Sequence, residues 1–127
     1  MISGVDDYAK FANALCCGGT AQNGYRLLGD ATVELMRANH LDDTRMGDYN
    51  WGHHSGYGYG LGVRTMVDRA AGGSNSSIGE FGWSGMLGTY VLMDPSVELT
   101  YVYAQQLMPS KEEYVAPRLR NIIYGCL

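Results

Sequence analysis

The segment GEFGWSGMLGTYVLMDP, residues 79–95, has the pattern of two strands joined by a tight turn, and it places Trp83, Ser84 and Gly85 at the edge of that turn. A glycine lets another molecule approach the backbone closely, and a serine hydroxyl can donate a hydrogen bond to a substrate oxygen. These residue types at the end of a strand suit one wall of an acyl-transfer site. The alternative is the flank of an ordinary hairpin.

Ser84 could itself be a nucleophile, because GWSGM approaches the G-x-S-x-G pattern of hydrolases. The pattern ends at Met86 instead of glycine, and a nucleophile elbow needs a strand that turns into a helix, whereas GTYVLM continues as a strand. No spacing of His53 or His54 with an aspartate indicates a catalytic triad. We therefore expect neither a nucleophile nor a general base in this segment.

A metal site is not indicated by the histidines, because His40, His53 and His54 lack a regular spacing and adjacent residues of a strand point to opposite faces. We expect all three in exposed loops. The cysteines include no C-x-x-C pair and are predicted to be small buried apolar residues, without a metal or a cofactor. They are Cys16, Cys17 and Cys126.

The composition disfavours several classes of protein. The formal net charge is −4 and the nine Lys and Arg residues are scattered, so no basic stripe for nucleic acid is present. No apolar run approaches the ~20 residues of a membrane span, and no basic and then apolar leader opens the sequence. An apolar content of 46% in 127 residues can build one core.

Three segments show the apolar periodicity of helices. The first follows Ser3 as a predicted N-cap, the second follows Asp30, and the third follows Ser110 and contains Pro117. Residues 42–55, between the second helix and the strands, are predicted to be an irregular loop. The expected apolar stripe of the third helix is Val115, Leu119, Ile122 and Ile123.

Glycines at every second position from Gly56 to Gly62 predict a strand with one bare face, against which another element can press. A phosphate loop is disfavoured, because the spacing is not G-x-G-x-x-G and no Gly-Lys-Ser follows. Further strands are predicted near residues 78–83, 89–93 and 98–106, and short turns make neighbouring strands antiparallel. The predicted fold class is α+β, an antiparallel sheet flanked by helices in the order helix-helix-strand-strand-strand-strand-helix.

The succession of these segments resembles the C-terminal part of the β-lactamase-related serine hydrolases, which include class C β-lactamases, penicillin-binding-protein-like peptidases and esterases. The stretches that carry the resemblance are DDYAKFANALCCGG, RLLGDATVELM, GYGYGLGVRT, GEFGWSGMLGTYVLMDP and LTYVYAQQ. The resemblance implies that residues 1–127 are a single fragment of a β-lactamase-like domain, whose N-terminal part with the catalytic serine is absent.

The third active-site motif of that family lies on a strand beside the nucleophile and is commonly Lys-Thr-Gly, His-x-Gly or Trp-x-Gly. Trp83, Ser84 and Gly85 match it, and the resemblance implies that the backbone N–H of Met86 forms half of the oxyanion hole. Trp83 lacks the positive charge with which a lysine would attract a substrate carboxylate. We therefore expect an ester or amide without a carboxylate, and β-lactam hydrolysis is disfavoured.

The first two motifs of the family, Ser-x-x-Lys and Tyr-x-Asn, are not found in this sequence. The residues three positions before the two lysines are Asp7 and Met108, and no tyrosine is followed two positions later by asparagine. The chain alone is therefore expected to be inactive. In the full-length protein the expected partner is a small-molecule ester, amide or β-lactam-like substrate, and a sheet edge left exposed could support a dimer or strand exchange. The resemblance implies a bacterial protein of the cytoplasm, the periplasm or the exterior. The alternative is a non-catalytic binding or structural module of the same ancestry.

Overall fold

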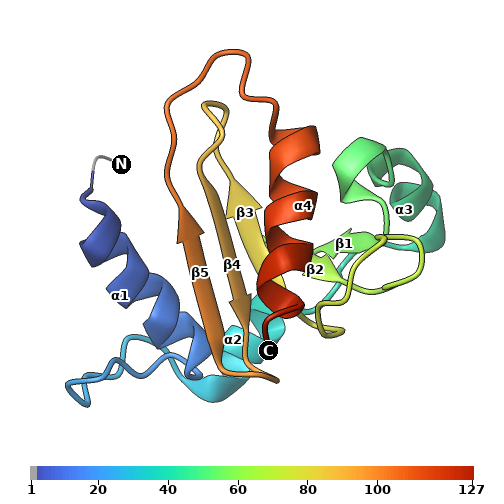
Figure 1. The fold of residues 1–127 in the computed structure, drawn as a ribbon. Coiled ribbons are helices and arrows are strands. Elements are labelled where there is room, and N and C mark those ends of the chain that lie inside the picture. Colours follow the sequence, from blue (N-terminus) through green and yellow to red (C-terminus); the bar gives the residue numbers. More distant parts are fainter. Residues whose placement is uncertain (1–2) are drawn as a thin grey trace.

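An antiparallel sheet of five strands forms the centre of the computed structural model, which describes residues 3–127 (Figure 1). Each strand pairs with its neighbour in sequence, so the order in the sheet is β1-β2-β3-β4-β5. The predicted α+β class and antiparallel sheet are confirmed. The strands are β1 (Tyr57–Tyr59), β2 (Arg64–Met66), β3 (Phe81–Ser84), β4 (Tyr90–Asp94) and β5 (Leu99–Tyr103).

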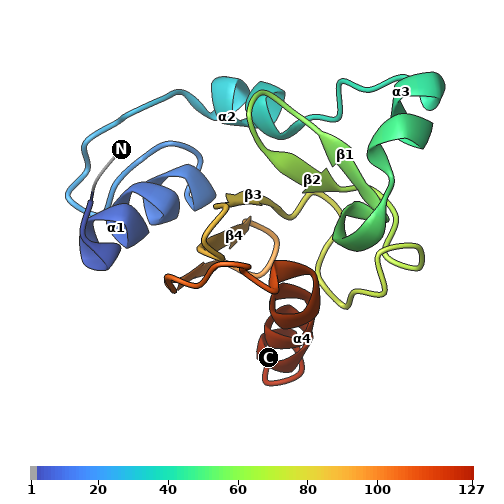
Figure 2. The same cartoon turned by 90° about the horizontal axis from the view of Figure 1, so that it is seen from above.

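Helices cover both faces of the sheet. Helices α1 (Val5–Cys16) and α2 (Asp30–Arg37) lie on one side and α4 (Glu112–Tyr124) lies on the other (Figure 2). Side chains alternate along β4, so Val91 and Met93 pack with α1 while Tyr90 and Leu92 pack with α4. The sheet therefore has a separate apolar core on each face, and β3 is the central strand of the sheet.

The predicted loop over residues 42–55 is wrong, because this segment contains a helix and a helical turn. Helix α3 spans Asp43–Tyr49 and the 3₁₀ turn η1 spans Gly52–His54. The Asp42 carboxylate accepts a hydrogen bond from the Arg45 backbone N–H at 2.9 Å and caps α3. The helix buries no residue, so its sequence carries no apolar stripe that could have predicted it.

The glycine-rich segment forms a hairpin instead of one strand, which gives five strands where four were predicted. The chain turns between β1 and β2, where Gly62 has a φ of +82°. The prediction that another element presses against the bare face is correct. A Cβ at Gly58 would lie 2.4 Å from the Asn39 side chain, and one at Gly60 would lie 2.1 Å from the Met36 carbonyl oxygen.

The helix boundaries differ from the predictions. Gly4 and Gly29 occupy the N-cap positions of α1 and α2 in place of Ser3 and Asp30, and Lys111 precedes α4 in place of Ser110.

The predicted apolar stripe of α4 is only partly correct, because Val115, Leu119 and Ile123 are half-buried and none of the four residues is fully buried. The helix buries Ala116 and Arg120, whereas Ile122 is 63% exposed. The reason is that this face of the sheet presents the polar side chains of Tyr57 and Glu80, so an arginine turns inward.

Only one of the three cysteines behaves as predicted. Cys16 is buried in the core, whereas Cys17 and Cys126 are exposed. Among the described residues, 3–127, no helix has the length and apolar character needed to cross a membrane.

Candidate active-site wall

Strand β3 fixes the position of the candidate motif. Trp83 pairs with Val91 and Ser84 pairs with Tyr90 of β4. Beyond Ser84 the chain reverses in a tight turn, in which the Gly85 N–H donates to the Thr89 carbonyl at 2.6 Å. Because the strand leads into a turn and not into a helix, Ser84 does not lie on a nucleophile elbow.

Gly85 differs from the glycines on either side of it. A Cβ at Gly82 would lie 2.1 Å from the Val91 carbonyl oxygen, and one at Gly88, which has a φ of +90°, would lie 1.9 Å from the Gln105 side chain. A Cβ at Gly85 would meet nothing closer than the Thr89 Cβ, at 3.6 Å, which is an ordinary contact. The fold of this chain therefore does not require a glycine at position 85.

The Met86 amide lies at the exposed tip of the turn, and the Met86 side chain is 75% exposed. Within residues 3–127 no acceptor is bonded to the Met86 N–H, whereas the N–H groups of Gly85 and Gly88 are both bonded within the turn. An exposed backbone donor is thus available beside Gly85.

Aromatic rings surround Trp83. Its ring centroid lies 5.2 Å from that of Tyr59 and 5.9 Å from that of His54, which in turn stacks on Tyr49 at 5.0 Å. Trp51 meets His54 edge-on at 4.9 Å. We call these five residues the aromatic cluster. All but Tyr59 and Trp83 come from the segment between residues 42 and 55 that was predicted to be a loop.

The prediction that all three histidines lie in exposed loops is wrong. His40 is exposed, but His53 is half-buried and His54 is buried. The pKa of His54 is lowered to about 4, mainly by burial and to a smaller extent by the neighbouring positive charges of His53 and Arg64, against the opposing effect of Glu112. The imidazole of His54 is therefore neutral at pH 7, so it adds no charge to the aromatic cluster.

Ser84 lies beside a carboxylate from another element. Glu112, the first residue of α4, has its Oε1 3.2 Å from the Nε2 of His53, and Ser84 lies near the same carboxylate. Burial alone would raise the pKa of Glu112, but the polar side chains of His53 and Ser84 beside it outweigh burial and lower it. Ser84 thus lies beside a carboxylate that stays ionised at pH 7, and no histidine is bonded to its hydroxyl in the described part of the chain.

Sequence reasoning did not find Glu112 or His53 as neighbours of the motif. Neither residue belongs to a local pattern with Ser84, and only the packing of α4 and η1 beside β3 brings the three together. Across residues 3–127 no group of three or more His, Cys, Asp or Glu side chains is arranged to hold a metal ion.

Comparison with known proteins gives the family. A model of the family described as "Beta-lactamase" matches residues 1–124. Two curated proteins of Mycobacterium tuberculosis, Uncharacterized protein MT1414 of strain CDC 1551 / Oshkosh and Protein Rv1367c of strain ATCC 25618 / H37Rv, are each 33% identical over 115 residues. These residues are 84% of this chain and 28% of each relative.

Two solved structures share the fold. EstCE1, "a hydrolase with promiscuous acyltransferase activity", superposes with a TM-score of 0.76 at 22% identity over 97% of this chain and 30% of its own. Simvastatin Synthase (LovD) from Aspergillus terreus has a TM-score of 0.73 at 20% identity over 98% of this chain and 34% of its own. The chain thus spans about a third or less of the proteins that it matches. With a family match over nearly all its residues, the chain belongs to the β-lactamase family.

Proposed function

We propose that this chain supplies one wall of the active site of a serine hydrolase that acts on small esters or amides through an acyl-enzyme. Trp83, Ser84 and Gly85 form its third motif, and the Met86 N–H is one donor of its oxyanion hole. The observation that carries the proposal is the unbonded Met86 N–H at the end of β3, directly after a glycine whose missing side chain leaves room for a substrate.

The chemistry explains why both features are needed. When a serine oxygen attacks the substrate carbonyl, the C=O electron pair moves to the oxygen, and that negative charge must be met by fixed donors. One such donor lowers the barrier by about 3 kcal/mol. The donor can reach the oxygen only if the backbone approaches the substrate closely, which Gly85 permits. The nucleophile and its base come from a part of the protein outside these residues, because Ser-x-x-Lys and Tyr-x-Asn do not occur in this sequence.

The substrate proposal rests on charge. The wall presents the indole of Trp83, the phenol of Tyr59 and the neutral imidazole of His54, and none of these attracts a carboxylate at pH 7. An ester or amide without a carboxylate is therefore favoured over a β-lactam. The structural neighbour EstCE1, named as a hydrolase with promiscuous acyltransferase activity, is in keeping with acyl transfer.

The experiment is complementation. The chain is mixed with the N-terminal part of a relative that contains the serine nucleophile, and hydrolysis of a p-nitrophenyl ester is followed. We expect no turnover by the chain alone, turnover by the mixture, and its loss in Gly85→Val. Turnover by the chain alone that Ser84→Ala abolishes would show that Ser84 is the nucleophile and would overturn the proposal.

The alternative is a non-catalytic binding module, and the specific observation that favours it is Trp51, which lies at the aromatic cluster and is 58% exposed. An exposed indole above other rings is a common platform for apolar ligands. This function predicts that the complemented protein binds ester analogues but does not hydrolyse them, and that Trp51→Ala weakens binding while Gly85→Val does not.

A further inference from the structure

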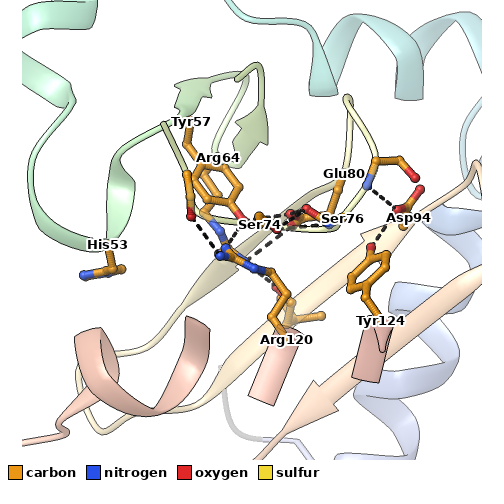
Figure 3. A network of polar contacts seen from close by, with 12 residues as sticks. His53, Tyr57, Arg64, Ser74, Ser76, Glu80, Asp94, Arg120 and Tyr124 are labelled. Atoms are coloured by element: carbon orange, nitrogen blue, oxygen red, sulfur yellow. Dashed lines mark hydrogen bonds and ion pairs between the residues drawn. The ribbon is translucent and has the colours of Figure 1, made fainter. Parts of the chain in front are cut away.

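Arg120 of α4 is a buried cation that has no ion pair within the described residues, 3–127. Its side chain points from α4 towards β1 and belongs to a residue that is only 3% exposed (Figure 3). One guanidinium nitrogen donates to the Tyr57 hydroxyl and another donates to the Gly72 carbonyl at 3.2 Å. Within residues 3–127 no carboxylate lies within 4.0 Å of Arg120. Buried arginines are normally paired, because an unpaired charge is costly to remove from water.

The nearby carboxylate of Glu80 is already engaged. It accepts hydrogen bonds from the Tyr57 hydroxyl at 2.7 Å and from the Ser76 hydroxyl at 3.1 Å, and it lies 3.7 Å from a guanidinium nitrogen of Arg64. The Tyr57 hydroxyl therefore stands between Glu80 and Arg120. Glu80 is thus the carboxylate nearest to two buried guanidinium groups. It forms an ion pair with Arg64 but does not contact Arg120.

A cavity of about 580 Å³ opens beside Arg120, between η1, residues 71–73 and α4. Two side chains that line it, Arg120 and His53, each have a buried nitrogen without a hydrogen-bond partner in the described chain, namely Nε of Arg120 and Nδ1 of His53. Arg118 and Glu113 also line the cavity and are exposed, so their charges are largely screened by water. Two residues at the cavity, one of them positively charged, therefore each have a nitrogen that no group of the described chain bonds.

We propose that this cavity binds a small oxyanion, a carboxylate or a phosphate, whose charge pairs with Arg120. The Nε–H of Arg120, which has no partner in the described chain, is free to donate a charge-assisted hydrogen bond to an oxygen of such an anion. The imidazole of His53, whose Nε2 faces Glu112, lines the same cavity and leaves its Nδ1 without a partner in the described chain. The site is independent of the proposed hydrolase function, because it uses neither Trp83 nor the Met86 amide.

The test follows the Nε–H resonance of Arg120 by NMR in ¹⁵N-labelled protein. Sodium acetate and inorganic phosphate are titrated separately, with sodium chloride at matched ionic strength as the reference. We expect a saturable shift with acetate or phosphate that chloride does not produce. The anion that binds more tightly identifies the ligand as a carboxylate or a phosphate.

Two variants locate the site. Arg120→Gln removes the charge, and Ala71→Phe fills the cavity from its exposed rim while leaving Arg120 in place. Each should weaken binding by roughly tenfold or more, about 1.4 kcal/mol, measured by calorimetry. Arg69→Gln is the matched control, because it removes the same charge from an exposed arginine that does not line the cavity, and it should leave binding unchanged.

Two results overturn the inference. One is a shift that chloride reproduces, or the absence of a saturable shift with both anions. The other is binding that persists in Ala71→Phe, because the anion then lies elsewhere. If Arg120→Gln fails to fold, Ala71→Phe decides the question alone.

Discussion

The Nε2 of His53 lies 3.2 Å from the Oε1 of Glu112, so the turn η1 is joined to the first residue of helix α4. Ser84, at the end of β3, lies close enough to the same carboxylate to help lower its pKa. Three elements that are distant in the sequence therefore meet at one acidic side chain. Glu112 thus joins η1 to α4 directly beside the candidate motif.

Replacing Glu112 by glutamine should destabilise the protein at neutral pH and much less in acid. The pKa of Glu112 is held below its ordinary value of 4.5, so its contribution to stability is present above that pH and is lost as the pH falls through the lower folded-state pKa. We expect Glu112→Gln to lower the free energy of unfolding by about 1–2 kcal/mol at pH 7. Urea unfolding at pH 7 and pH 3 measures the difference.

The control is Glu113→Gln, which makes the same change in charge at the exposed neighbouring position. It should have little effect at either pH, since exposed charges contribute little. An equal loss of stability in both variants would show that the charge near the start of α4 matters and that the contacts of Glu112 do not.

The glycines of the β3–β4 hairpin should separate into two kinds. Gly85→Ala should leave the free energy of unfolding within about 0.5 kcal/mol of the parent, because the added Cβ meets only ordinary contacts. Gly88→Ala should lower it by about 1 kcal/mol or more, since Gly88 has a φ of +90° and its Cβ would collide with Gln105. Urea midpoints compare them, and a Gly85→Ala variant as unstable as Gly88→Ala would make Gly85 a structural glycine.

Exchanging Trp83 for lysine should change the preferred substrate. An ammonium group at this position would attract a substrate carboxylate that the indole does not attract. In the complemented enzyme, we expect Trp83→Lys to raise kcat/KM for a carboxylate-bearing ester relative to its neutral methyl ester by roughly tenfold, about 1.4 kcal/mol. Trp51→Lys adds the same charge at an exposed ring and should leave the ratio unchanged. An unchanged ratio in Trp83→Lys would place Trp83 away from the acyl group.

The sequence predicted those elements whose signals are local. Helices α1 and α2 have apolar periodicity, and Asp94-Pro95 marks the turn between β4 and β5. The alternating glycines from Gly56 to Gly62 predicted a strand face without side chains. The end of α2 and the residues after it cover that face at Gly58 and Gly60. These local signals predicted the fold class. The order of the segments along the chain gave the family resemblance, and that resemblance identified Trp83, Ser84 and Gly85 as the candidate motif.

The remaining features depend on contacts between distant segments. Glu112 and Arg120 lie on a helix whose apolar residues predicted a different buried face, because two buried polar side chains of the sheet select the arginine. Helix α3 and the turn η1 were missed since a short helix without a buried residue has no periodicity to detect. These are the segments that supply His53, His54 and Trp51 to the site.

The bond between Tyr124 and Asp94 should anchor the end of α4 to the sheet. The Tyr124 hydroxyl donates to the fully buried Asp94 carboxylate at 2.6 Å, and the backbone N–H groups of Ser77 and Ser96 donate to the same side chain.

Burial alone would raise the pKa of Asp94, but these hydrogen bonds outweigh burial and lower it below its ordinary value of 3.8. Removing one donor in Tyr124→Phe should therefore lower the free energy of unfolding by about 1–3 kcal/mol at pH 7. The loss should shrink as the pH falls below about 4, where the carboxylate takes up a proton in the unfolded chain and then in the folded one. Tyr114→Phe, which removes an exposed hydroxyl from the same helix, is the matched control and should unfold like the parent. A loss in Tyr124→Phe that is the same at pH 7 and pH 2.5 would mean that ring packing, and not the bond to Asp94, holds this end of α4.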